Sequence, residues 1–244
     1  MSETIINQRQ IHWFPGHMAK TLRLMEQEIR HIDCVLQILD ARIPLSSLNP
    51  EIERITAGKP HLYVLNKADL ADPEITQQWL AYFRSAGAGC LPMDSRQKGR
   101  ANAIKGPIEK ELAALTERRR ARGMVGARIH VMVVGIPNVG KSTFINSFAG
   151  EARAKAANKP GVTRGKQWIT VGNYPQRLLE RYKLPAEALE LPPYDLLLAI
   201  GAKRGMLISG GEVDSERAAK TVVGEFRASK WGRISLERPP RPAA

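Results

Sequence analysis

The chain has 244 residues, 43% of them hydrophobic and 25% charged, which allows one α/β domain with a sizeable core and a smaller appendage. No apolar run reaches the length of a membrane span, and Met1–Thr4 lacks the pattern of a signal peptide, so we expect a cytoplasmic protein outside membranes. Its 37 lysines and arginines against 24 acidic residues give a net charge of +13. This excess is typical of proteins that bind a polyanion, most often nucleic acid, and a merely solvated basic surface is the alternative.

The N-terminal segment predicts a helix, a strand and a second helix. A Pro15-Gly16 turn leads into a helix that we expect to end near Arg30. Residues 32–39 form an apolar run typical of a buried strand, and Asp40-Ala41-Arg42-Ile43-Pro44 follows it. Because α/β folds bind ligands at the carboxyl ends of parallel strands, this polar segment is expected near a ligand. A helix over 50–57, ended by Gly58, comes next.

The next strand, over 61–65, runs into Asn66-Lys67-Ala68-Asp69, which is the Asn-Lys-x-Asp pattern of guanine recognition. The carboxylate of Asp69 can accept hydrogen bonds from N1–H and the N2 amine of guanine, whereas adenine has no such pair of donors. The stem of Lys67 can lie against the base, and Asn66 can tie the loop to neighbouring backbone. An exposed turn after a strand is the alternative, and the phosphate-binding loop described below favours guanine recognition.

A helix over 73–85 and a short strand over 89–93 lead to Asp94 and Ser95. In GTPases a loop at this place supplies backbone N–H groups to guanine O6, so we include both residues in the predicted site. Residues 103–122 predict an arginine-rich helix, whose charges suit its own C-terminus or a solvated face.

The apolar run over 129–134 predicts a buried strand that enters Gly135-x-x-x-x-Gly140-Lys141-Ser142 and then a helix. This is the pattern of a phosphate-binding loop, in which successive N–H groups and a helix N-terminus converge on phosphate oxygens. Lys141 would reach the β- and γ-phosphates, and the hydroxyl of Ser142 would ligate Mg²⁺. A chance glycine-rich turn is the alternative. The nucleotide contacts predicted along this loop are Asn138, Val139, Gly140, Lys141, Ser142 and Thr143.

Residues 153–166 carry five basic side chains and no acidic one, and they read as a loop. Thr163 fits the switch threonine that ligates Mg²⁺ only when the γ-phosphate is present. A strand over 167–172 should precede an Asp-x-x-Gly motif, but Asn173 is followed directly by Tyr174 and a helical pattern. A doubly wound sheet cannot lose a strand there without opening its core. We therefore infer that a segment is missing near 173/174.

From residue 174 onward the pattern is helical. We expect helices near 178–182, over 196–204, and from Asp214 or Ser215 to before Gly232, with a proline-rich connection over 189–194. Basic residues should surround this small core, where they fit RNA phosphates or serve solubility alone. They are Lys203, Arg204, Arg217, Lys220, Arg227, Lys230 and Arg233.

The motif order, with guanine recognition first, the phosphate-binding loop second and the switch threonine third, is a circular permutation of the usual GTPase order. With Trp13-Phe14-Pro15-Gly16-His17-Met18-Ala19-Lys20 and Asp40-Ala41-Arg42-Ile43-Pro44, it closely resembles the bacterial YlqF/RbgA family of ribosome-biogenesis GTPases. The resemblance implies that His17 promotes hydrolysis, in place of the glutamine that orients water in Ras-like enzymes. An exposed histidine after a turn is the alternative. The resemblance also makes Asn138 a candidate ligand of K⁺.

The sequence therefore predicts an α/β fold in two parts. One is a doubly wound, mostly parallel, circularly permuted G domain over 1–173, and the other is a small α-helical, RNA-binding domain over 174–244. We expect a monomeric GTP hydrolase that uses GTP, GDP and Mg²⁺ and has no DNA target. The resemblance implies that the large ribosomal subunit and its rRNA stimulate it, and that hydrolysis drives late assembly of the subunit and release of the factor.

Two other functions fit parts of the pattern. A kinase or ATPase could use the same phosphate-binding loop, but Asn66-Lys67-Ala68-Asp69 argues against adenine. A nucleotide-bound RNA-binding scaffold without significant turnover would show the same charge.

Overall fold

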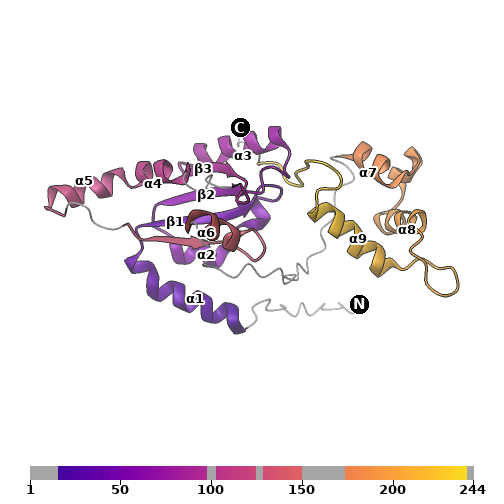
Figure 1. Ribbon diagram of the computed structural model, residues 1–244, viewed down its shortest axis with the longest axis horizontal. Helices are drawn as coiled ribbons and strands as arrows, with labels where there is room; N and C mark the ends of the chain where they lie inside the picture. Colours follow the sequence, from indigo (N-terminus) through magenta and orange to yellow (C-terminus); the bar gives the residue numbers. More distant parts are fainter. Residues whose placement is uncertain (1–15, 98–102, 125–128, 150–173, 241–244) are drawn as a thin grey trace, which may run out of the picture.

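The computed structural model describes residues 16–97, 103–124, 129–149 and 174–240, and the side chains of 16–21, 148 and 149 are outside this description (Figure 1). Its centre is a parallel sheet with the strand order β3-β2-β1-β4. The strands are β1 (Cys34–Asp40), β2 (His61–Asn66), β3 (Gly89–Met93) and β4 (Val131–Val134). In register, Asp40 lies opposite Asn66 and Asn66 opposite Met93. The polar residues that end these strands therefore meet at one edge of the sheet.

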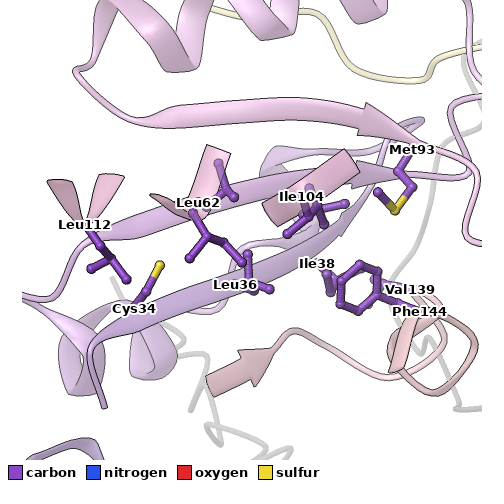
Figure 2. Close-up of a cluster of buried hydrophobic side chains, with 11 residues drawn as sticks. Cys34, Leu36, Ile38, Leu62, Met93, Ile104, Leu112, Val139 and Phe144 are labelled. Atoms are coloured by element: carbon purple, nitrogen blue, oxygen red, sulfur yellow. The ribbon is translucent and has the colours of Figure 1, made fainter. Parts of the chain in front are cut away.

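Helices cover both faces of the sheet, as the sequence predicts for a doubly wound fold. One face packs against α4 (Lys105–Glu111), α5 (Ala113–Ala121) and α6 (Lys141–Ala149). Figure 2 shows its core, in which Leu36 and Ile38 of β1 and Leu62 of β2 contact the helical residues Ile104, Leu112 and Phe144. Every residue of β1 is buried, because this strand lies inside the sheet and is covered from both sides.

The other face is covered by α1 (Gly16–Glu28), α2 (Pro50–Thr56) and α3 (Pro73–Ser85). Asp72 caps α3 by accepting hydrogen bonds from the N–H groups of Glu74 (2.9 Å) and Ile75 (3.3 Å), and Pro73 occupies the first turn. These signals are local, and the predicted bounds of α3 agree with the structure. The helix predicted over 103–122 is instead two helices, α4 and α5, that meet at Leu112.

The C-terminal part is a separate helical unit beside the sheet, with α7 (Pro175–Tyr182), α8 (Pro193–Lys203) and α9 (Ser215–Arg227) (Figure 1). Its own core contains Leu178, Tyr182, Leu196, Ile200, Val222, Phe226 and Trp231. The connection predicted over 189–194 is shorter than expected, because a 3₁₀ turn occupies Ala186–Glu190 and α8 begins at Pro193. Proline suits a first helical turn, where its missing N–H has no helical partner. Within the described residues, no helix has the length and apolar character needed to span a bilayer.

The segment after α9 returns to the sheet domain, which the sequence did not indicate. The N–H of Ile234 donates to the carbonyl oxygen of Leu70 (3.2 Å), and the N–H of Leu236 donates to that of Arg42 (2.8 Å). The indole of Trp79 on α3 donates to the carbonyl oxygen of Glu237 (3.2 Å). The helical unit is thus held against the loops at the carboxyl edge of the sheet.

Candidate nucleotide-binding site

The phosphate-binding loop joins β4 to α6, as predicted, and its shape requires the two glycines of the motif. Gly135 has φ 146° and Gly140 has φ 99°, values that side chains rarely allow. A Cβ at Gly135 would collide with the carbonyl oxygen of Ile38, and one at Gly140 with the amide nitrogen of Asn66. The loop therefore lies directly against β1 and against the guanine-recognition motif.

The first turn of α6 brings three motif residues to this loop. The N–H of Phe144 donates to the carbonyl oxygen of Gly140 (2.9 Å), which starts the helix with Lys141, Ser142 and Thr143 in its first turn. The ammonium of Lys141 donates to the carbonyl oxygen of Ile136 (2.7 Å) within the loop, and burial lowers the pKa of Lys141. A lysine and a helix N-terminus at one loop form an environment suited to phosphate.

The side chain of Asn66 connects three loops at the edge of the sheet. Its amide nitrogen donates to the carbonyl oxygen of Val139 in the phosphate-binding loop (2.7 Å). Its amide oxygen accepts from the N–H (3.1 Å) and the hydroxyl (2.7 Å) of Ser95 after β3. Asn66 and Ser95 are both buried, at 3% and 4% exposure, so water does not replace these bonds. Three motifs that are far apart in the sequence are joined by one amide.

Lys67 makes a second connection from the same motif. It has a left-handed backbone at φ 60°, and its ammonium donates to the carbonyl oxygen of Asn138 (2.7 Å) and to Oδ2 of Asp40 (2.8 Å). Burial would raise the pKa of Asp40, but the Arg42 guanidinium and the Lys67 ammonium outweigh burial and hold it at about 2. Asp40 is therefore a carboxylate anion that orients Lys67 beside the phosphate-binding loop.

Asp69 and Asp94 share one arginine. The guanidinium of Arg96 bonds to Oδ2 of Asp69 and, through Nε, to Oδ1 of Asp94 (3.0 Å). The hydrogen bond from Arg96 lowers the pKa of Asp94 below its ordinary value. Oδ1 of Asp69 is buried and accepts no hydrogen bond from any described residue. The carboxylate predicted to accept from guanine thus has one buried oxygen without a partner among the described residues and one oxygen paired with an exposed arginine.

Comparisons with known proteins agree with this arrangement. Residues 130–182 match a family model described as a 50S ribosome-binding GTPase. A ribosome biogenesis GTPase A of Priestia megaterium is 36% identical over an alignment of 284 positions, which covers 94% of this chain and 97% of the relative. The chain belongs to the ribosome biogenesis GTPase A family. It is accordingly a GTP hydrolase that binds GTP and GDP.

Two further proteins show the same likeness. The crystal structure of GNP-bound YlqF from T. maritima aligns with a TM-score of 0.59 at 25% identity and covers 90% of this chain and 98% of that one. Mitochondrial ribosome-associated GTPase 1 of Xenopus tropicalis is 37% identical over 63% of this chain and 50% of its own length. The predicted fold class and the resemblance to YlqF/RbgA are confirmed.

Several predicted site residues meet at one edge of the sheet. The hydrogen bonds above join Asn66, Lys67, Ser95, Asn138 and Val139, whereas Asp69 and Asp94 meet through Arg96. His17 is the second residue of α1, and its side chain is not among those described. Thr163 and the predicted strand over 167–172 lie outside the described residues.

Two residues at this edge were not predicted as site residues. Asp40 and Arg96 both pair with members of the guanine-recognition motif. A signal for Asp40 was present in the sequence, because it ends a buried strand at the edge where ligands bind. Arg96 had no such signal, since its partner Asp69 is fixed only by the packing of β2 beside β3.

Proposed function

We propose that this GTPase binds the immature large ribosomal subunit and couples GTP hydrolysis to late assembly of the subunit and to its own release. The observation that carries the proposal is the Asn66 amide, which holds the phosphate-binding loop, the guanine-recognition loop and the Ser95 loop together. Relatives named for ribosome biogenesis and a family model named for the 50S ribosome support the choice of partner.

The base would be recognised by the loops after β2 and β3. Asp69 accepts from N1–H and the N2 amine of guanine, and Arg96 leaves Asp69 when the base arrives. The stem of Lys67 lies along the base plane, and the segment of Asp94 and Ser95 offers backbone N–H groups to O6. ATP lacks the paired donors, so this arrangement selects GTP.

The phosphates would be held by the loop and the first turn of α6. Backbone N–H groups of Val139, Gly140 and Thr143 would donate to phosphate oxygens, and Lys141 would stabilise the charge on the transferring phosphoryl group. Ser142 and Thr163 would hold Mg²⁺, which would offset the negative charge of the phosphates. Asn138, which matches a K⁺-binding position of cation-dependent relatives, is the candidate ligand for K⁺.

Hydrolysis would depend on a group that the ribosomal partner brings into position. His17, at the N-terminal end of α1, is the proposed residue that orients or deprotonates the attacking water. The ribosomal partner would position this histidine, so we expect slow intrinsic turnover. Hydrolysis then lowers affinity for the particle and releases the factor.

Contact with rRNA would come from exposed basic residues of the helical unit. Lys203, Arg217, Arg227 and Lys230 are exposed, and these side chains fit phosphate contacts whose strength falls with salt. Arg233 is used within the molecule, where it donates to the carbonyl oxygen of Ala71 (2.9 Å). We expect a monomer that acts in the cytoplasm with no DNA target.

The domain division at 173/174 and a missing segment at that place belong to the same proposal. The alignment with the P. megaterium relative has 284 positions, more than the 244 residues of this chain, so the relative contains residues with no counterpart here. The sequence lacks an Asp-x-x-Gly motif after residue 172, where a G domain carries its magnesium-binding strand. An intact mass well above 27.1 kDa for the natural protein would support the omission.

Cosedimentation with purified large subunits tests this function. We expect binding with a non-hydrolysable GTP analogue, release with GDP, and weaker binding for Lys230→Glu than for Lys220→Glu, because Lys220 already pairs with Glu216 (2.5 Å). Equal binding with both nucleotides would favour the scaffold function instead.

A further inference from the structure

Asp40, at the carboxyl end of β1, is the meeting point of two cations from different parts of the chain. Its side chain is 6% exposed. Arg42 binds it with two parallel hydrogen bonds, from Nε to Oδ1 (2.9 Å) and from Nη2 to Oδ2 (2.8 Å). Lys67 donates to the same Oδ2 (2.8 Å). The positions of Arg42 and Lys67 therefore depend on each other through one carboxylate.

The remaining nitrogen of Arg42 reaches the helical unit. Nη1 donates to the carbonyl oxygens of Phe226 (3.2 Å) and Arg227 (3.4 Å) in the last turn of α9. The guanidinium also lies over the ring of Phe226, 4.6 Å from its centroid. Carbonyl oxygens at a helix C-terminus carry the negative end of the dipole, so a buried cation suits them. A lysine could not bond the carboxylate and these carbonyls at once.

The chain of contacts also extends to the phosphate-binding loop. Lys67 bonds both Asp40 and the carbonyl oxygen of Asn138 (2.7 Å). An unbroken series of hydrogen bonds therefore runs from Asn138 through Lys67, Asp40 and Arg42 to the end of α9. The side chains of Asp40 and Arg42 are 6% and 4% exposed, so solvent does not absorb a shift between these two members.

A second attachment joins the helical unit to the guanine-recognition motif itself. Arg233 donates through Nη2 to the carbonyl oxygen of Ala68 (3.0 Å), the third residue of the Asn-Lys-Ala-Asp motif. The N–H of Ile234 donates to the carbonyl oxygen of Leu70 (3.2 Å), just after that motif. The C-terminal helical unit thus contacts the loop of Lys67 and Asp69 in two ways, directly through Arg233 and Ile234 and indirectly through Arg42 and Asp40.

We propose that Arg42 is a positioning residue that couples the nucleotide site to the helical unit, by holding Asp40 against Lys67 on one side and the end of α9 on the other. The proposal rests on the proposed assignment of Lys67 and Asn138 to the nucleotide site. Coupling of this kind is reciprocal, so a nucleotide that fixes Lys67 tightens the docking of α9, and an RNA ligand that moves α9 changes nucleotide affinity.

A double-mutant cycle on GDP affinity tests the coupling. Arg42→Lys keeps a cation beside Asp40 but gives up the contact with α9. We expect it to weaken GDP binding by about fivefold or more in the otherwise unmodified chain. In a Lys67→Ala background the same change should alter affinity by less than about twofold, because the connection is already broken. Arg181→Lys is the matched control, since Arg181 pairs with Glu225 of α9 (2.6 Å) and does not contact Asp40.

Equal losses in both backgrounds, or no loss in either, would overturn the proposal. If Lys67→Ala alone leaves GDP affinity unchanged, the site assignment fails first and the coupling with it. Hydrogen exchange on the unmodified chain covers the case in which Arg42→Lys does not fold. GDP should slow exchange at Ala228 and Ser229, whose N–H groups bond to Gly224 and Phe226 at the end of α9, by about fivefold or more. Identical exchange with and without GDP would contradict the coupling.

Discussion

Replacement of Asn66 by alanine should separate the three loops of the nucleotide site. The change removes three hydrogen bonds, to Val139 and to two groups of Ser95, in a place where Asn66 is 3% exposed. Each bond contributes about 1 kcal/mol net, so reassembly of the loops around a nucleotide would cost up to about 3 kcal/mol. That cost corresponds to a loss of GDP affinity of up to roughly 100-fold.

A fluorescent GDP analogue measures this affinity, and urea unfolding measures stability in parallel. Asp214→Ala is the matched control, because Asp214 caps α9 in the helical unit by accepting from the N–H of Arg217 (2.9 Å). That variant should lose about 1 kcal/mol of stability and keep its GDP affinity. If Asn66→Ala destabilises the chain but binds GDP as tightly as Asp214→Ala does, the hydrogen bonds of Asn66 do not assemble the nucleotide site.

Three further outcomes follow from single side chains. Arg96→Ala should strengthen GDP binding by up to about fivefold at low salt, because GDP must displace this exposed arginine from Asp69. An unchanged dissociation constant for GDP would refute this competition. The pKa of Asp40 falls from 3.8 to about 2 on folding, so its stabilisation is complete above pH 3.8 and is lost as pH falls through 2. Urea unfolding between pH 4 and 2 should therefore show a decline of about 2 kcal/mol that Asp40→Asn lacks, and equal declines would contradict it. His17→Ala should lower subunit-stimulated turnover without changing GDP affinity, and a matched loss of both would remove its catalytic role.

Much of the fold follows from local sequence signals. The apolar run that became β1 is buried throughout, the run that became β2 is mostly buried, and Asp72-Pro73 marked the start of α3. The phosphate-binding loop was predicted because its tight turn requires glycine at fixed positions. The φ values of 146° at Gly135 and 99° at Gly140 agree with this requirement.

The sequence predicted that the motifs lie close together, but not which hydrogen bonds join them. Asn66 and Ser95 are near the ends of adjacent parallel strands, which predicts proximity, while the shared amide depends on register. The contact between Arg42 and α9 joins residues more than 180 positions apart, and no local pattern encodes it. The break at Leu112 was missed for a similar reason, since that side chain is buried by the sheet and not by its own helix.

GTP hydrolysis with and without purified large ribosomal subunits, in K⁺ buffer and at two salt concentrations, tests the central claim most directly. The account predicts slow turnover alone and strong stimulation by subunits that fades as salt rises, because phosphate contacts hold the complex. An unchanged rate despite demonstrable GTP binding would contradict a ribosome-activated GTPase.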